Sequence, residues 1–156
     1  MSAPIEQRVR RQGRILAAQA LYQAEITGGD ATEAVAVASR IGAEEEGHAP
    51  SEPAEEWARW LVEQFTGRRL QVDHLIEETS ANWRLDRMAR MDLQILRIGV
   101  TELAVGRADV PTPVAIDEAI EVARVLGSEQ APAFVNGVLD AVSRRLAAVA
   151  DGGAGE

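Results

Sequence analysis

Cysteine and lysine are both absent from this chain of 156 residues. The absence of cysteine excludes disulfides, a thiolate nucleophile and cysteine-ligated zinc. The absence of lysine excludes a Walker A loop and the Schiff-base chemistry of pyridoxal phosphate enzymes. All 16 basic residues are therefore arginines, a bias that the codons of a GC-rich genome explain. Several enzyme classes are excluded before any motif is considered.

Aromatic residues are also scarce, at 4% of the chain, whereas apolar residues as a whole make up 46%. Aliphatic side chains and alanine must fill most of the core, which suits packed helices better than a β-sandwich. No stretch approaches the roughly 18 apolar residues of a membrane span. Residues 8–18 resemble a signal peptide, but Gln19, Gln23 and Glu25 interrupt the apolar region, so we interpret the segment as an amphipathic helix of the mature protein. We expect a cytoplasmic protein.

Apolar residues recur three and four positions apart along most of the chain, which is the spacing of one face of an α-helix. The helical stretches are residues 5–27, 32–40, a long segment from Pro53 to near Asn82 with a bend at Gly67, 86–106, 113–126, and 128 onward. The acidic segment 42–53, rich in Gly, Pro and Ser, is expected to be a solvated loop. The sequence predicts one all-α domain over residues 1–150. It is a compact bundle of about seven helices in two subdomains, about 1–82 and 83–150, with a disordered tail at 151–156.

Residues that commonly cap helices lie at the expected boundaries: N-caps at Asp30 or Thr32, at Asp86 and at Ser128, and a C′ glycine at Gly127. The dipeptide Asn136-Gly137 by itself would signal a β-hairpin. Its flanks have helical rather than alternating periodicity, so we expect a helix. Close packing against another backbone would then explain Gly137.

The charge of the chain is unevenly distributed. Residues 1–14 carry four arginines against Glu6, a local charge of +3, whereas the remainder carries 12 arginines against 24 acidic residues, a local charge of −12. The four arginines fall within an arc of roughly 160° on one helix: Arg8, Arg10, Arg11 and Arg14. Guanidinium groups grip phosphates and stack on bases. RNA or another polyanion is the ligand we favour over a merely solvated helix start, because cations there oppose the helix dipole.

Other candidate residues remain open to two interpretations. Four charged residues lie among strongly apolar neighbours, where they either form internal ion pairs or meet a partner protein: Asp92, Arg97, Glu102 and Asp117. The aromatic stripe of Trp57, Trp60 and Phe65 has the spacing of core packing, although a stacking platform is the alternative. The two histidines, at positions 48 and 74, lack the spacing of a metal site, and no catalytic motif is present. We therefore expect no cofactor, no metal and no enzymatic activity.

Four stretches, in order along the chain, resemble the NusB family of transcription antitermination factors. They are residues 14–25 (RILAAQALYQAE) after an arginine-rich start, residues 91–97 (MDLQILR) followed by 101–103 (TEL), residues 110–111 (VP) with 114–123 (VAIDEAIEVA), and residues 134–140 (FVNGVLD). The last stretch is the most specific. The resemblance spans essentially the whole chain.

The resemblance implies an all-helical protein of two small bundles that binds boxA RNA together with the ribosomal protein NusE. It implies entry into the RNA polymerase antitermination complex, which acts in ribosomal RNA transcription. RNA contacts would come from Arg8, Arg10, Arg11 and Arg14 and, at the start of the last helix, from Gln130 and Phe134. Tyr22 and Asp92 match positions of the NusE contact, and we place Glu102 on the same partner surface.

Two alternatives can be considered. One is a protein-binding or self-associating helical module, in which a homodimer would hide the RNA-binding face. The other is the NusB-like domain of an RNA cytosine methyltransferase, but the chain is too short for a methyl-donor domain and lacks its glycine-rich signature.

Overall fold

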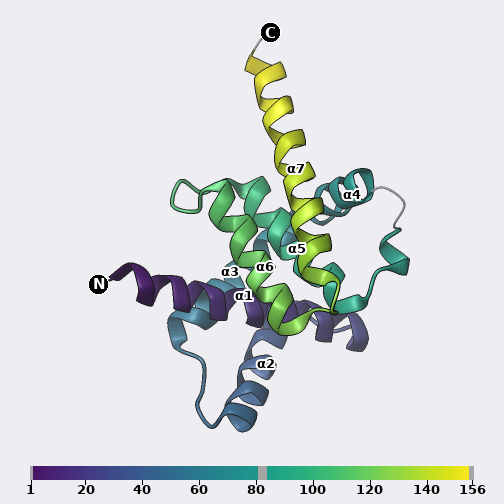
Figure 1. The fold of residues 1–156 in the computed structure, drawn as a ribbon. Helices are drawn as coiled ribbons and strands as arrows, with labels where there is room; N and C mark the ends of the chain where they lie inside the picture. Colours follow the sequence, from purple (N-terminus) through teal and green to yellow (C-terminus); the bar gives the residue numbers. More distant parts are fainter. Residues whose placement is uncertain (1, 81–83, 155–156) are drawn as a thin grey trace. The chain divides into compact units, whose positions relative to one another are not determined.

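The computed structural model describes residues 2–80 and 84–154, which form seven α-helices and one 3₁₀ turn. The predicted all-α fold is confirmed. The helices divide into two compact units, Met1–Gly67 and Arg68–Glu156, and Figure 1 traces the helices of each.

The first unit contains α1 (Ser2–Thr27), α2 (Ala31–Glu46) and α3 (Glu52–Gly67). Helix α1 packs against both of the others. Small side chains bring the helices close together: Ala17, Ala18 and Ala20 of α1 and Ala54 and Ala58 of α3 are fully buried. Such close packing makes this unit sensitive to any added side-chain volume.

Helix α2 is longer than the sequence suggested. Asp30 caps it, its carboxylate accepting hydrogen bonds from the amides of Thr32 (2.7 Å) and Glu33 (3.2 Å). The helix then continues through Glu46 and ends at Gly47, whose φ of 79° is left-handed. The expectation of an acidic loop over residues 42–53 is therefore wrong for residues 42–46, which belong to α2, and for residues 52–53, which belong to α3. Glutamate is a good helix former, and the loop is confined to the few residues between Gly47 and Glu52.

The long helix expected from Pro53 to near Asn82 is two helices. Helix α3 ends at Gly67, the chain leaves helical geometry at Arg68 (φ −123°), and α4 (Arg69–Thr79) follows. Because α4 packs on α5 and α7, it belongs to the second unit, and the two units divide at Gly67 and not near residue 82. Residues 81–83 lie outside the described part of the chain.

The second unit contains α4, the 3₁₀ turn η1 (Leu85–Arg87), α5 (Arg90–Val105), α6 (Thr112–Leu126) and α7 (Ala131–Ala154). Helix α5 is buried at every position from Asp92 to Glu102, and α4, α6 and α7 all pack on it. The predicted N-cap Asp86 lies in η1 instead, and α5 begins after Ala89.

The turn between α6 and α7 differs in detail from the expected caps. Gly127 is extended (φ −82°, ψ 175°) rather than left-handed. It is glycine because an added Cβ would lie 2.6 Å from the Cβ of Ala131 and 2.8 Å from the carbonyl oxygen of Ala123. Ser128 does not cap α7, because α7 begins only at Ala131; the Ser128 hydroxyl donates to Asp92 instead.

The predicted helix through Asn136-Gly137 is confirmed, but the reason expected for its glycine is wrong. A Cβ at Gly137 would meet nothing within 4 Å. Helix α7 continues to Ala154, through most of the expected tail, and residues 155–156 lie outside the described residues. Its C-terminal half extends past the other helices of its unit (Figure 1).

Candidate nucleic-acid interface

The four arginines of α1 differ in their exposure. Arg8 and Arg11 are exposed, the side chain of Arg10 is 16% exposed, and Arg14 is only 2% exposed. The helix therefore presents a cationic face at Arg8 and Arg11 with Arg10 partly accessible, while Arg14 belongs to the interior.

The indole ring of Trp57 lies beside the two inner arginines, Arg10 and Arg14. The guanidinium carbon of Arg10 lies 4.4 Å from the centroid of the Trp57 ring, and that of Arg14 lies 5.8 Å from it. Both distances are within the range of cation–π attraction. Trp57 belongs to α3, and its ring also contacts that of Trp60 at 5.0 Å. The aromatic stripe thus divides: Phe65 is a core residue, whereas half-buried Trp57 supports the basic helix.

Gly13 makes this arrangement possible. A Cβ at that position would lie 2.8 Å from the Cδ1 atom and 2.9 Å from the Cβ atom of Trp57, and 2.9 Å from the carbonyl oxygen of Ala54. Glycine in the interior of a helix costs about 1 kcal/mol relative to alanine, so its presence between two arginines is a sequence signal of close approach. No sequence pattern identified Trp57 as the residue it approaches.

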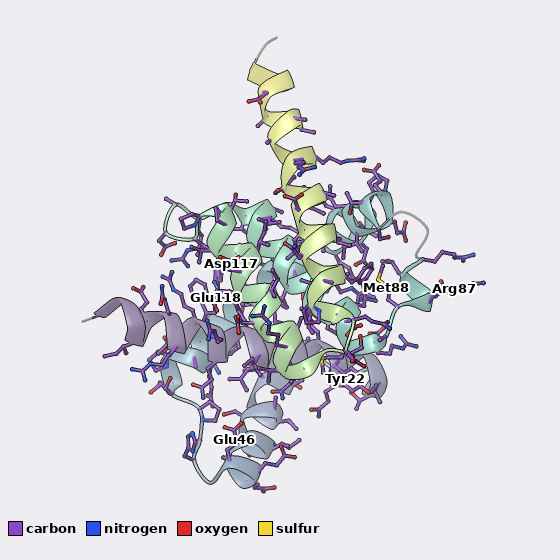
Figure 2. All side chains as sticks on the ribbon, viewed as in Figure 1. Tyr22, Glu46, Arg87, Met88, Asp117 and Glu118 are labelled. Carbon is purple, nitrogen blue, oxygen red and sulfur yellow. The ribbon has the colours of Figure 1, made fainter. Side chains whose placement is uncertain are left out.

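Tyr22 lies on the same helix, eight residues beyond Arg14, which corresponds to about 12 Å along the axis. It is half-buried and is labelled in Figure 2. The first unit therefore carries the candidate RNA-binding arginines and one candidate partner residue on a single helix.

In the second unit, three of the predicted site residues line one pocket of about 360 Å³. Asp92, Gln130 and Phe134 lie there, and the remaining lining residues are Arg87, Met88, Ala89 and Ser128. The pocket is formed where η1, the start of α5 and the start of α7 meet. Arg87 and Met88, at the end of η1 (Figure 2), were not predicted. They come from a connector without periodicity, and only the fold brings them beside Phe134.

Asp92 is occupied within the protein. Its carboxylate accepts hydrogen bonds from the amide (3.0 Å) and the hydroxyl (2.7 Å) of Ser128. Asp92 thus fixes the turn that leads into α7 and so helps to shape the pocket. Glu102 does not line the pocket, and it is buried on α5 with 4% of its surface exposed.

The other two charged residues in apolar surroundings have different environments. Arg97 forms two parallel hydrogen bonds of 2.9 Å to the carboxylate of Asp73, so it is an internal ion pair. Asp117 is exposed on α6 (Figure 2).

The described part of the chain shows neither a metal site nor a membrane-spanning helix. No group of three or more His, Cys, Asp or Glu side chains among those residues could hold an ion. No helix in residues 2–80 or 84–154 has both the length and the apolarity that crossing a bilayer requires.

The fold and these surfaces define a class of protein: an all-α chain of two small helical units, the first opening with a cationic helix and the second carrying a pocket at the start of its last helix. Residues 11–144 match the model of the NusB family.

Individual relatives agree with that match. The chain is 47% identical over 137 residues to the transcription antitermination protein NusB of Myxococcus xanthus (strain DK1622), a match that covers 88% of this chain and 96% of the relative. Among solved structures it is similar to T. maritima NusB, with a TM-score of 0.73, 31% identity, and coverage of 86% of this chain and 90% of that one. It is also similar to a chain in a crystal structure of antitermination factors NusB and NusE in complex with dsRNA, with a TM-score of 0.72, 26% identity, and coverage of 88% and 98%. The chain belongs to the NusB family.

Proposed function

We propose that this protein is a transcription antitermination factor that binds boxA-type RNA together with the ribosomal protein NusE. In this role it joins the antitermination complex on RNA polymerase during ribosomal RNA transcription. The observation that carries the proposal is the cationic face of α1, where Arg8 and Arg11 are exposed on an otherwise acidic chain. Its likeness to a NusB chain solved with NusE and dsRNA supports the same ligands.

The RNA contacts divide between the two units. On α1, Arg8, Arg11 and the accessible part of Arg10 neutralise phosphates, which fixes the position of the RNA without reading its sequence. In the second unit, half-buried Phe134 provides a face on which an unstacked base can lie, and the exposed amide of Gln130 supplies a donor and an acceptor beside it. Stacking plus phosphate neutralisation is what recognition of single-stranded RNA requires.

We assign direct contact with NusE to Tyr22, since it is the accessible member of the expected set. Asp92 and Glu102 are buried, so their contribution to that contact goes through the position of α5 and of the α6–α7 turn. The protein acts in the cytoplasm, where transcription takes place, and by binding without a catalytic step of its own.

The test measures binding of a short fluorescent boxA RNA by anisotropy, with and without NusE, at several salt concentrations. The double variant R8A/R11A should bind the RNA about tenfold more weakly. The slope of log K against log salt concentration should become shallower by about 0.7 for each phosphate that the variant no longer neutralises. A matched control is R124A/R144A, which removes two exposed arginines from the second unit. Equal affinity of R8A/R11A and the wild type would contradict the proposal.

The proposed contact of Tyr22 with NusE is tested separately, by co-purification. Tyr22→Ala should reduce co-purification of NusE while leaving the RNA affinity of the chain alone unchanged. Sizing of the pure protein distinguishes the alternative, because a stable dimer that binds neither RNA nor NusE would support a self-associating module instead.

A further inference from the structure

We propose that Trp57 and Glu6 control the phosphate contact made by Arg10: the indole positions the guanidinium, and the Glu6 carboxylate occupies it until the RNA backbone replaces it. Neither residue belongs to the RNA-contacting set described above. The inference rests on the proposed RNA binding and deepens it.

The positioning role of Trp57 follows from the geometry around Gly13. The ring lies against the backbone of α1 at Gly13, and Arg10 and Arg14, which flank that glycine, both reach over it. The Arg10 side chain is thereby 16% exposed and confined to one region of space. A long side chain that is already ordered loses less conformational entropy when it binds a ligand.

An indole does this without cancelling the charge that RNA binding needs. Arg10 and Arg14 are four residues apart on one helix face, where like charges repel each other. An acidic residue between them would relieve the repulsion but would also repel phosphate. The π face of Trp57 attracts both cations and adds no negative charge. The net charge of the basic segment therefore stays positive.

Glu6 has the opposite effect on the same guanidinium. Its Oε1 atom lies 2.9 Å from the Nη2 atom of Arg10, in a pair four residues apart. The glutamate is N-terminal to the arginine, which is the favourable orientation on a helix. Its side chain is 58% exposed, so water and an incoming anion can reach it.

A carboxylate and a phosphate present similar oxygens to an arginine fork, so RNA competes with Glu6 for the Nη2 atom of Arg10. The displacement is unfavourable for a lone anion. The RNA backbone also contacts Arg8 and Arg11, and the attraction of its other phosphates to these two arginines favours the displacement. Glu6 thus favours the RNA backbone over isolated phosphate ions.

The first experiment removes the competing carboxylate. Glu6→Gln should bind boxA RNA about two- to fivefold more tightly, the range expected from loss of an exposed ion pair, and its salt dependence should steepen by up to about 0.7. The control is Glu63→Gln, which removes one exposed acid from α3 of the same unit and should leave that slope unchanged. An equal gain in both variants would show a general charge effect and overturn the role of Glu6.

The second experiment tests the indole. Trp57→Leu should weaken RNA binding about fivefold, and Trp57→Phe, which keeps a π face, should retain most of the affinity. In an Arg10→Met background, Trp57→Leu should cause no further weakening, since neighbouring residues in one interaction are non-additive. Circular dichroism checks that each variant stays helical.

The outcomes distinguish a failure of the proposed RNA binding from a failure of the roles of Trp57 and Glu6. A wild-type protein that does not bind boxA RNA would overturn the proposed function itself. A wild type that binds RNA, combined with an unchanged dissociation constant in Glu6→Gln and Trp57→Leu at every salt concentration, would overturn only this inference. An equal weakening from Trp57→Leu with and without Arg10 would show a structural role and overturn the positioning of Arg10.

Discussion

Gly13→Ala is the substitution for which the structure gives the clearest expected magnitude. The added methyl would enter the contact between α1 and α3, at 2.8 Å from the Cδ1 atom of Trp57 and 2.9 Å from the carbonyl oxygen of Ala54. The carbonyl belongs to the backbone and cannot rotate away, so the two helices must separate slightly.

Two opposing free-energy contributions determine whether Gly13→Ala stabilises or destabilises the protein. Replacing glycine by alanine inside a helix gains about 1 kcal/mol of helix propensity. Overpacking of a well-packed contact costs about 1–3 kcal/mol, and we expect a cost of about 2 kcal/mol here because one of the clashing atoms is fixed in the backbone. We expect a net destabilisation of about 1 kcal/mol. For a chain of this length that lowers Tm by about 2–4 °C.

The control is Gly137→Ala, the same substitution in the interior of a helix where a Cβ meets nothing within 4 Å. There only helix propensity changes, and Tm should rise by about 2–4 °C. Thermal unfolding followed by circular dichroism measures both variants under identical conditions. If Gly13→Ala stabilised the protein as much as Gly137→Ala, the close contact of Gly13 with Trp57 would be refuted.

Four further substitutions have expected outcomes in urea unfolding. Asp73→Ala leaves the buried guanidinium of Arg97 without its bidentate partner and should cost about 3–5 kcal/mol, whereas Arg97→Met should cost clearly less; equal destabilisation would contradict a desolvated pair. Asp30→Ala removes the cap of α2 and should cost about 1 kcal/mol, with no change in RNA affinity. Asp92→Ala deprives Ser128 of its acceptor and should cost about 1–3 kcal/mol, and it should also weaken RNA binding through the altered pocket; unchanged affinity would separate that turn from the RNA site.

Hydrophobic periodicity was sufficient to predict the fold class, because it depends only on local geometry. The helix through Asn136-Gly137 is an instance: its apolar neighbours at helical spacing outweighed a dipeptide that favours turns. Boundaries failed where a tertiary contact decided them. The helix is interrupted at Arg68, and α4 then packs on α5 and α7. The sequence of residues 53–82 by itself does not indicate where those helices lie.

The sequence predicted which residues form the candidate site, but it did not predict how exposed each of them is. Helical spacing placed four arginines on one face of α1, yet it could not show that Arg14 would be buried against Trp57. The tryptophan lies more than forty positions away in the sequence, so the contact depends on how α1 packs on α3. Arg87 and Met88 escaped prediction for the same reason: they reach Phe134 only through the fold of the second unit.

The uneven charge of the chain determines how its RNA binding must work. Of the four opening arginines, Arg14 is buried and Arg10 is paired with Glu6, so α1 neutralises only about two or three phosphates. With a slope of about −0.7 per phosphate for single-stranded RNA, such a contact is weak and is easily reversed by salt. A second contact with the same RNA strengthens the overall binding, because it raises the effective concentration of RNA at α1 without altering the α1 contact itself. The remainder of the chain carries a charge of −12 and repels RNA, so this second contact must come from stacking, as at Phe134, or from another protein. Dependence on a protein partner is therefore a consequence of the charge distribution, and NusE should raise RNA affinity at every salt concentration while leaving the salt dependence at least as steep as that of the chain alone.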